Sequence, residues 1–421
     1  MPPFPWSLPT VLFLLLAAPA PLHAQPEGPP GEADVIHPAP EIEWRQIAEL
    51  PARPGYAKPE GLAGAFAGAH GDVLLIAGGT NYAGQPFSPN ASKAWWADIY
   101  VLQRSVTPAQ KMAYTWLPPE AELPRNLAYG ASASIPGGVL CIGGTELNEV
   151  SSACFLMKWN AQLKKVEFED FPSLPKPLAA ATAVKIGNTV YVLGGTSHWP
   201  ANQATNTFLA LDLTKKDDPA AFKWLELPAW DGPARIFPVA AASLENGVES
   251  IYLCGGRDPG NDPDFLTDLH KFNPIKKDWA ILGNIVDPSG HPSSIMAAPA
   301  FHVAPHHLVI VSGTDQELVR MMENNQRKLE ALDVPEKRAR LQFNELLLKN
   351  YPGYTRTVMA YDAEVGEWSS IGNFPGEACL TTPVVNWSGS MILPGGETGP
   401  GKRSPLIWEA TVRKKASIVE D

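Results

Sequence analysis

The chain has 421 residues, of which 45% are hydrophobic and 18% charged, and its formal net charge is −11. This composition is typical of a globular protein, and the acidic balance without a long basic stripe argues against a nucleic-acid partner. The 43 prolines and 35 glycines favour many short strands joined by turns.

The first 40 residues carry targeting and linker signals. The apolar run VLFLLLAA over 11–18 precedes small residues and prolines, and it predicts a signal peptide over 1–24, cleaved near Ala24. The run is too short to span a bilayer. We therefore expect a periplasmic or secreted protein with no membrane contact after cleavage. Residues 25–40 are rich in Pro, Gly and Glu and predict a linker, followed by a single domain over 41–421.

Six apolar strands ending in glycine recur along the chain with a spacing of roughly 50–60 residues, apart from one longer gap. They occupy residues 73–79, 139–144, 190–195, 251–256, 308–313 and 391–396. An apolar strand precedes each one, and a third strand and an aromatic-containing outer strand follow. The pattern resembles kelch repeats. It predicts an all-β fold, a six-bladed kelch-type β-propeller with four antiparallel strands in each blade.

The sixth repeat lacks its outer strand, because the sequence after 405–412 supplies none. Residues 41–50 supply an outer strand with the required Trp44 and no repeat before it. We expect the N-terminal strand to complete the sixth blade, close the ring and remove two exposed sheet edges.

The longer gap contains a glycine-free charged segment over 316–350. Its apolar spacing predicts two short helices separated near Pro335. The segment is either a solvated protrusion or a lid over the binding face, and the sequence favours neither.

The four cysteines are too few for a disulfide scaffold, and three lie in or beside predicted strands. Buried thiols are the default expectation for Cys141, Cys154, Cys254 and Cys379. A bridge between Cys141 and Cys154 remains an open alternative.

Polar residues in two sets of loops should converge on the mouth of the central channel, because both loop types lie on one face of a propeller. The loops that follow the glycine strands carry Asn81, Glu146, His198, Arg257, Asp315, Glu397 and Arg403. The loops that connect successive blades carry Arg125, Arg235, Thr381 and Thr382.

The most specific stretch is GGETGPGKRS over 395–404, in which a tight turn at Pro400-Gly401 can place Glu397 beside Arg403. Here the chain resembles the sialic acid mutarotases, or N-acetylneuraminate epimerases, a kelch propeller family. The position of the motif near the C-terminus, with GGTNYAG, SGTD, YPGYTRTVMAYD and TTPVVNW elsewhere, resembles a cyclically permuted branch of that family.

The resemblance implies a cofactor-independent exchange of the α and β anomers of a sialic acid by general acid–base ring opening and closure. Glu397 is carried over as the proton-transferring group and Arg403 as the partner of the C1 carboxylate. Arg125, Arg235, Arg257 and Asn81 are substrate-binding candidates from loop position alone. The structural alternative for Arg125 and Arg235 is that they tie blades together, and for Asn81 that it caps a turn.

Other sites are not predicted. His302, His306 and His307 lie across a strand, a turn and a strand, where Pro305 forbids an aligning helix, so no metal site is expected. The competing functions are a non-catalytic propeller that binds glycan or protein, and a mutarotase of another acidic sugar. The sequence does not indicate an oligomeric state.

Overall fold

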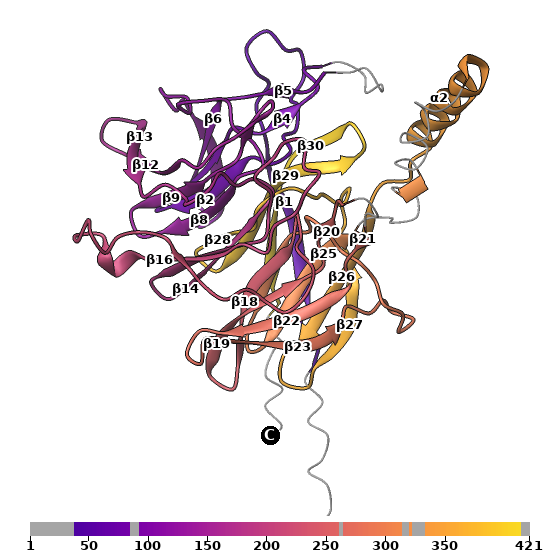
Figure 1. Ribbon diagram of the computed structural model, residues 1–421. Helices are drawn as coiled ribbons and strands as arrows, with labels where there is room; N and C mark the ends of the chain where they lie inside the picture. Colours follow the sequence, from indigo (N-terminus) through magenta and orange to yellow (C-terminus); the bar gives the residue numbers. More distant parts are fainter. Residues whose placement is uncertain (1–37, 85–91, 261–263, 314–319, 322–332, 414–421) are drawn as a thin grey trace, which may run out of the picture. The chain divides into compact units, whose positions relative to one another are not determined.

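The computed structural model describes residues 38–84, 92–260, 264–313, 320–321 and 333–413. These residues form six four-stranded antiparallel sheets (Figure 1). The prediction of an all-β six-bladed propeller is therefore confirmed. The predicted signal peptide and most of the linker lie outside the described residues.

The first five blades each use four strands in chain order, from the channel outwards. Blade one contains β2 (Phe66–His70), β3 (Val73–Ala77), β6 (Ile99–Val106) and β7 (Met112–Leu117). Blade two contains β8 (Ala131–Ile135), β9 (Gly138–Ile142), β12 (Cys154–Asn160) and β13 (Lys165–Phe171). Blade three contains β14 (Thr182–Ile186), β15 (Thr189–Leu193), β16 (Phe208–Asp212) and β17 (Leu225–Glu226).

The next two blades repeat this order. Blade four contains β18 (Val239–Glu245), β19 (Val248–Cys254), β22 (Asp268–Asn273) and β23 (Asp278–Asn284). Blade five contains β24 (Ala300–Val303), β25 (His307–Gly313), β26 (Thr355–Asp362) and β27 (Glu367–Asn373). A short 3-10 helix, η1 (Leu213–Lys215), follows the third strand of blade three.

The sixth blade joins the two ends of the chain. Its strands are β28 (Val385–Trp387), β29 (Ser390–Gly399), β30 (Lys402–Val412) and, at the outer edge, β1 (Ile42–Glu49). β1 pairs antiparallel with β30, with Ile42 opposite Val412. Trp44 packs edge-to-face on Phe374 of blade five, with ring centroids 4.9 Å apart. The predicted closure by the N-terminal strand is confirmed.

A ring of backbone hydrogen bonds lines the channel at one equivalent residue of each blade. Each N–H donates to the carbonyl of the preceding blade over 2.7–2.9 Å, and the sixth bond returns to the first blade. All six residues have left-handed φ angles between +49° and +66°, which costs energy for the five that are not glycine. The ring residues are Gly64, Tyr129, Ala180, Phe237, Ala297 and Thr381.

Hydrophobic clusters fill the wedges between neighbouring blades. One cluster joins Leu140 of blade two to Val190 of blade three and includes Trp224. Another joins Val309 of blade five to Leu393 of blade six. Packing is thus between blades as well as within them, which makes the ring, rather than any single blade, the folding unit.

The four cysteines are buried and unbridged. Cys141 on β9 packs in the cluster between blades one and two, whereas Cys154 on β12 packs in the cluster between blades two and three. Their side chains therefore lie on opposite faces of one sheet. That geometry answers the open question, because a disulfide needs both Cβ atoms directed at each other.

The described end of the insertion is the helix α2 (Val334–Lys349). Asp333 caps it by accepting the N–H of Glu336, and Pro335 occupies the first turn, so the predicted break near Pro335 marks the start of a helix. The helix predicted before it lies mostly outside the described residues. Most described side chains of α2 are exposed, as expected of a solvated protrusion.

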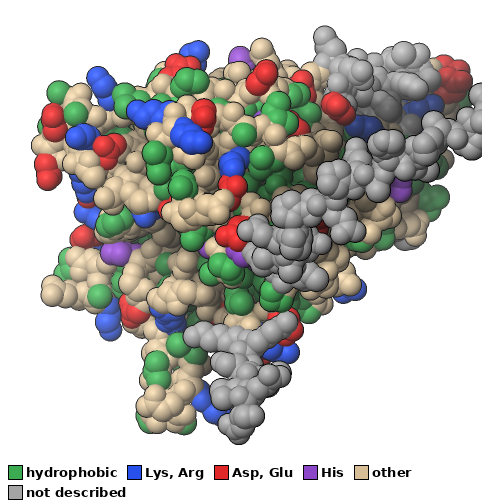
Figure 2. Space-filling view, turned by 90° about the horizontal axis from the view of Figure 1, so that it is seen from below, with side chains coloured by type: hydrophobic (Ala, Val, Ile, Leu, Met, Phe, Trp, Pro, Cys, Tyr) green, Lys and Arg blue, Asp and Glu red, His purple; other side chains and the backbone are tan. Residues whose placement is uncertain are grey.

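The face of the molecule in Figure 2 carries charges of both signs. Lys and Arg side chains are interspersed with Asp and Glu on the face shown in Figure 2. Such a surface differs from the basic track that binds nucleic acid. Among the described residues, no helix is both long and apolar enough to cross a membrane.

Candidate functional site

Short two-stranded ribbons extend four of the blades beyond their glycine pairs. They are β4 (Thr80–Asn81) with β5 (Ala94–Trp95), β10 (Thr145–Glu146) with β11 (Glu149–Val150), β20 (Arg257–Asp258) with β21 (Asp264–Phe265), and the tips of β29 and β30. The first residue after each pair of glycines faces a partner across the ribbon. The facing pairs are Thr80–Trp95, Thr145–Val150, Arg257–Phe265 and Glu397–Arg403.

Among the four described ribbons, that of blade six is the one in which both residues of this first facing pair are ionisable. At the position of Glu397, blades one, two and three carry Thr80, Thr145 and Thr196, which are fully buried. A carboxylate there is not needed for folding, since threonine fills the same place in three blades. The Glu397–Arg403 pair therefore departs from the repeat and marks a candidate site.

The backbone holds Glu397 in a fixed position. Its N–H donates to the carbonyl of Leu380 over 2.9 Å, and its carbonyl accepts from the Leu380 N–H over 2.8 Å. Gly396 before it has a φ of +120°, and a Cβ atom there would lie 2.6 Å from the Leu380 carbonyl oxygen. Only glycine allows this approach. Glu397 is thus anchored to Leu380, which directly precedes the ring residue Thr381 in the chain.

Arg403 reaches Glu397 across the two-residue turn at Pro400-Gly401, as the sequence predicted. Its Nη2 donates to Glu397 Oε2 over 3.2 Å. The Arg403 side chain is 3% exposed and that of Glu397 is 20% exposed. Within the described part of the chain, the buried Nε of Arg403 has no hydrogen-bond acceptor. The guanidinium therefore keeps bonding capacity for an anion.

Three further side chains complete what we call the mouth cluster, which comprises Tyr82, Lys93, Tyr129, Glu397 and Arg403. The ring centre of Tyr82 lies 5.0 Å from the Arg403 guanidinium carbon. Lys93 Nζ donates to the Tyr129 hydroxyl over 3.3 Å. Two cations and one carboxylate leave the mouth cluster with a net positive charge. An anionic ligand suits such a site.

The electrostatic coupling of these groups appears in their pKa values. Burial lowers the pKa of Arg403, but the charge of Glu397 and the nearby Tyr129 and Tyr82 raise it by more. The pKa of Lys93 is raised in the same way, against burial, by Tyr129 and then Glu397. Both cations therefore stay charged at neutral pH.

Tyr82 and Tyr354 beside the pair stay neutral. Burial raises the pKa of Tyr82, and the Glu397 charge adds to the effect. Burial also raises the pKa of Tyr354 far above its usual range, and the negative charge of Glu397 acts in the same direction. Neutral hydroxyls beside a carboxylate and two cations can donate or accept hydrogen bonds to a polyhydroxylated ligand.

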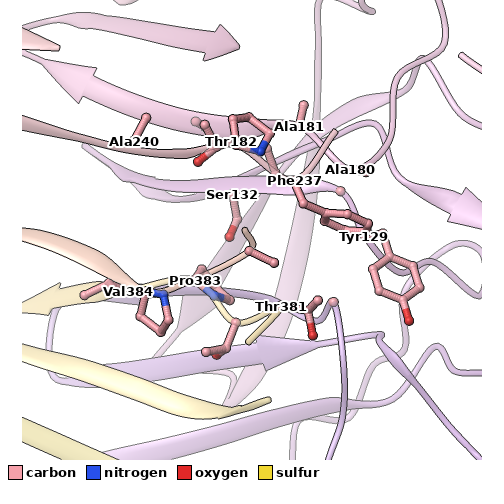
Figure 3. A pocket seen from close by; sticks show the side chains of 18 of the residues that line it. Tyr129, Ser132, Ala180, Ala181, Thr182, Phe237, Ala240, Thr381, Pro383 and Val384 are labelled. Atoms are coloured by element: carbon pink, nitrogen blue, oxygen red, sulfur yellow. The ribbon is translucent and has the colours of Figure 1, made fainter. Parts of the chain in front are cut away.

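The central channel opens beside this cluster. Its wall consists mainly of alanine, glycine and hydroxyl side chains of the inner strands, including Ser132, Thr182 and Thr382. The rings of Tyr129 and Phe237 lie next to each other at its edge, with centroids 5.9 Å apart (Figure 3). Tyr129 also stacks on Trp199 at 4.9 Å. Tyr129 thus belongs both to the channel wall and to the mouth cluster.

Of the four candidates chosen by loop position, Arg125 lies in the loop that connects blade one to blade two. It pairs with Glu146 and Glu149 over 3.0 Å and 2.8 Å, and its side chain is 41% exposed. The contacts fit the blade-tying alternative, in an exposed arrangement of small energetic value.

Arg235 is fully buried and held from several sides. Its Nη1 and Nη2 donate to the two carboxylate oxygens of Asp268 over 2.8 Å and 2.6 Å, and Nη1 also donates to the Gly255 carbonyl. Trp230 covers the guanidinium, with 5.1 Å from its ring centre to the guanidinium carbon. Such an arginine ties loops together, so the geometry favours the structural alternative over substrate binding.

Arg257 and Asn81 occupy ribbon positions on blades four and one. The guanidinium carbon of Arg257 lies 5.2 Å from the ring centre of Phe265, and the residue is partly exposed. The Asn81 carbonyl accepts from Trp96 Nε1 and from the Ala83 N–H. Its amide donates to Glu60 and Gly61. Asn81 therefore shapes the loop that carries Tyr82, as the turn-capping alternative states.

Tyr82, Lys93, Tyr129 and Tyr354 are not among the site residues predicted from the sequence. Three of them lie inside stretches that carried the family resemblance or a loop candidate, namely GGTNYAG, RNLAYG and YPGYTR. An aromatic residue next to a ribbon or ring position was the available signal. Lys93 had none, because its proximity to Tyr129 depends on tertiary structure.

A family model described as N-acetylneuraminate epimerase matches residues 33–166 and 171–419. The chain belongs to the N-acetylneuraminate epimerase family. Curated proteins of that name are similar over parts of their length. The one from Brucella melitensis is 34% identical over 134 residues, or 30% of this chain and 32% of that protein. The one from Pasteurella multocida is 26% identical over 257 residues, or 58% and 59% of the two chains.

The chain thus spans about a third of the length of the first of these curated relatives. The solved structure of YjhT is also similar, with a TM-score of 0.56 and 14% identity over 87% of this chain and 99% of that one. At that identity the likeness concerns the fold. The cyclically permuted order of blades within the epimerase family stays a prediction.

Proposed function

We propose that this epimerase-family chain interconverts the α and β anomers of N-acetylneuraminate without a cofactor. The observation that carries the proposal is the Glu397–Arg403 pair, 3.2 Å apart, set in a net-positive cluster at the channel mouth. Family membership and the names of the similar proteins support the choice of sugar.

The reaction needs one group that can move a proton between two oxygens. Glu397 takes the proton of the anomeric hydroxyl at C2, the bond between C2 and the ring oxygen breaks, and the ring oxygen receives a proton. C2 becomes the carbonyl carbon of the open chain. Rotation about the bond between C2 and C3 exposes its other face, and reclosure reverses the steps. Atoms and electrons are conserved throughout, so no co-reactant is required.

The cations of the mouth cluster provide the anion site. Arg403 donates one N–H to Glu397 and has a second buried donor, Nε, for which the described residues offer no acceptor. Because Arg403 is only 3% exposed, we assign the C1 carboxylate of the substrate to Arg403 together with the partly exposed Lys93. The guanidinium fixes the orientation of both carboxylates.

The test is anomer exchange followed by proton NMR on α-N-acetylneuraminate freshly released by a sialidase. The wild type should accelerate exchange over the buffer rate. Glu397→Gln should lower kcat by about 10²–10⁴-fold with an unchanged melting temperature. A matched control is Glu367→Gln, an exposed carboxylate on β27, which should keep full activity. A wild-type protein that does not accelerate anomer exchange would refute the proposed enzymatic activity.

Two further arms separate the competing functions. A non-catalytic glycan-binding propeller would bind the sugar, in saturation-transfer NMR, without changing its exchange rate. A mutarotase of another acidic sugar would accelerate a different uronic or ulosonic acid more strongly than N-acetylneuraminate. We also propose export to the periplasm or medium. N-terminal sequencing of the protein recovered outside the cytoplasm should then begin near Gln25.

A further inference from the structure

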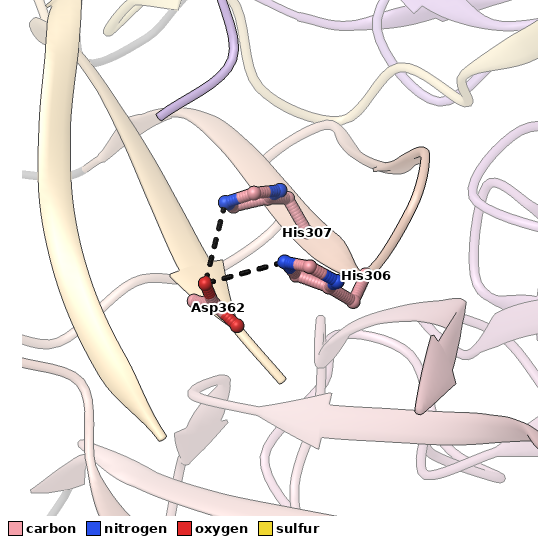
Figure 4. Close-up of side chains that lie close together, drawn as sticks. All are labelled: His306, His307 and Asp362. Carbon is pink, nitrogen blue, oxygen red and sulfur yellow. Dashed lines mark ion pairs between the residues drawn. The ribbon is translucent and has the colours of Figure 1, made fainter. Parts of the chain in front are cut away.

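Blade five contains a buried group of potential metal ligands at the opposite end of its second strand from Gly313. His306 and His307 lie where β25 begins, and Asp362 lies where β26 ends (Figure 4). The three residues are 5%, 4% and 7% exposed. Their ligating atoms all lie within 4.8 Å of one another. We propose that this His306–His307–Asp362 cluster binds one divalent transition-metal ion, with zinc as the best match.

The distances suit an inserted ion better than a direct pair. Asp362 Oδ2 lies 3.3 Å from His306 Nε2 and 3.6 Å from His307 Nε2. A charge-assisted hydrogen bond is about 2.7–2.9 Å long, and the chain shows one between His270 Nε2 and Asp268 Oδ2 at 2.7 Å. Ligands bound tetrahedrally to zinc at about 2.0–2.1 Å stand roughly 3.3–3.4 Å apart. The two imidazole rings, whose centroids lie 4.7 Å apart at an interplanar angle of 35°, have to direct both Nε2 atoms at the ion.

The two carboxylate oxygens of Asp362 have separate tasks. Oδ1 accepts the backbone N–H groups of Glu364 and Val365 over 2.9 Å and 3.3 Å, which fixes the turn after β26. Oδ2 faces both imidazoles, as Figure 4 shows. The turn therefore orients the carboxylate before any ion binds, and such preorganisation favours binding.

A second carboxylate lies on the far side of the first imidazole. Glu364 Oε2 is 3.5 Å from His306 Nδ1. A metal-binding histidine commonly donates its other N–H to a carboxylate, which directs the opposite nitrogen at the ion. Glu364 lies in the corresponding position beside Nδ1 of His306. Two imidazole nitrogens and one carboxylate oxygen select zinc or a similar ion over calcium and magnesium, which prefer all-oxygen sites.

Pro305 forbids a helix that would align these histidines, and for that reason the sequence predicts no metal site. The ligands come instead from a hairpin and the neighbouring strand, where His307 and Asp362 are register partners. The bound ion would tie the start of β25 to the end of β26. The proposed metal site lies at the start of β25, whereas the glycine end of this strand, Gly313, comes six residues later. The metal site is therefore separate from the loops of the proposed sugar site, and the inference does not depend on the sugar chemistry.

The test uses the full chain without a histidine tag, after treatment with a chelator. Equilibrium dialysis against Zn²⁺ should show one ion per chain, and zinc should raise the melting temperature. Asp362→Asn keeps an Oδ1 acceptor for the turn but removes the anionic ligand, and it should weaken binding at least tenfold. His307→Gln should do the same. His291→Gln removes an exposed histidine from a loop and should bind zinc like the wild type.

Two readouts guard against variants that merely unfold. Near-ultraviolet circular dichroism of the metal-free variants should match that of the wild type. Co²⁺ bound to the wild type should give the visible bands of a tetrahedral site, absent from His307→Gln. Fewer than one Zn²⁺ per wild-type chain, or equal zinc affinity in His307→Gln and His291→Gln, would overturn the proposal.

Discussion

The ring centre of Tyr82 lies 5.0 Å from the guanidinium carbon of Arg403, so blade one and blade six meet at the candidate site. An arginine over an aromatic face in a buried setting gains about 1–2 kcal/mol. Tyr82→Leu should therefore raise KM for N-acetylneuraminate by about 5- to 30-fold. Tyr82→Phe keeps the ring and should change KM much less. Equal KM values in the two variants would show that the Tyr82 ring does not contribute to substrate binding.

Lys93 offers a separate test of the anion site. We expect Lys93→Met to raise KM with a smaller change in kcat, because the lysine contributes charge but moves no proton. Arg403→Lys should lower kcat as well, since it disturbs the orientation of Glu397. Steady-state NMR rates at several sugar concentrations separate the two parameters. Lys158→Met, at a distant ion pair in blade two, is the control and should keep both.

The Arg235–Asp268 pair should matter for stability. Asp268→Asn leaves a fully buried guanidinium without its counter-charge and should lower the free energy of unfolding by about 3–5 kcal/mol at pH 7. The exposed Asp278 of the same blade gives a control, because Asp278→Asn should change little. Urea denaturation measures both. An unaltered urea midpoint in Asp268→Asn would show that the Arg235–Asp268 pair contributes nothing to the free energy of unfolding.

The pH dependence of that loss follows from the same carboxyl. Burial alone would raise the pKa of Asp268, but hydrogen bonds from His270 and Arg235 and the Arg235 charge lower it overall. Its pKa is thus lower in the folded than in the unfolded chain. The stabilisation is present above the unfolded value of about 3.9 and is lost as the pH falls through the folded value. The difference between wild type and Asp268→Asn should shrink below about pH 4.

The cysteines should be unreactive in the folded chain. Burial raises the pKa of Cys154, Cys254 and Cys379 to about 12 each, and that of Cys141 well above its usual range. Thiolate is therefore scarce at pH 8. Ellman's reagent should label no thiol in native protein and four per chain in guanidinium chloride. Fewer than four after unfolding without a reductant would indicate a disulfide.

The N-terminal strand should be essential for a closed ring. Deleting residues 39–50 exposes the edge of β30. The deletion also removes the contact between Trp44 and Phe374. We expect a lower melting temperature and self-association in light scattering. A peptide of residues 39–50 added in trans should reverse both effects by pairing with β30. A truncated chain that stays monomeric and equally stable would contradict the role of β1.

The repeat made the fold predictable, because each blade repeats the same order of strands, with glycine at or directly after the end of the second strand. The Glu397–Arg403 contact was predictable too, since a two-residue turn fixes which residues face each other. Arg235 was misleading because a loop position indicates a location but not exposure, and Asp268 comes 33 residues later. The closeness of Lys93 to Tyr129, and of His306 to Asp362, depends on strand pairing and on packing between segments far apart in the sequence.

The pairing of β1 with β30 also sets an order of events during synthesis. Arg45 and Glu409, which bond across these strands, are separated by 364 residues. A ribosome releases β1 first and β30 near the end, so the N-terminal strand has to wait for its partner. The same late hairpin brings Glu397 and Arg403. Glu397, the proposed proton-transferring group, is therefore positioned in the step that closes the ring, and an incompletely made chain has neither a sealed edge nor the Glu397–Arg403 pair.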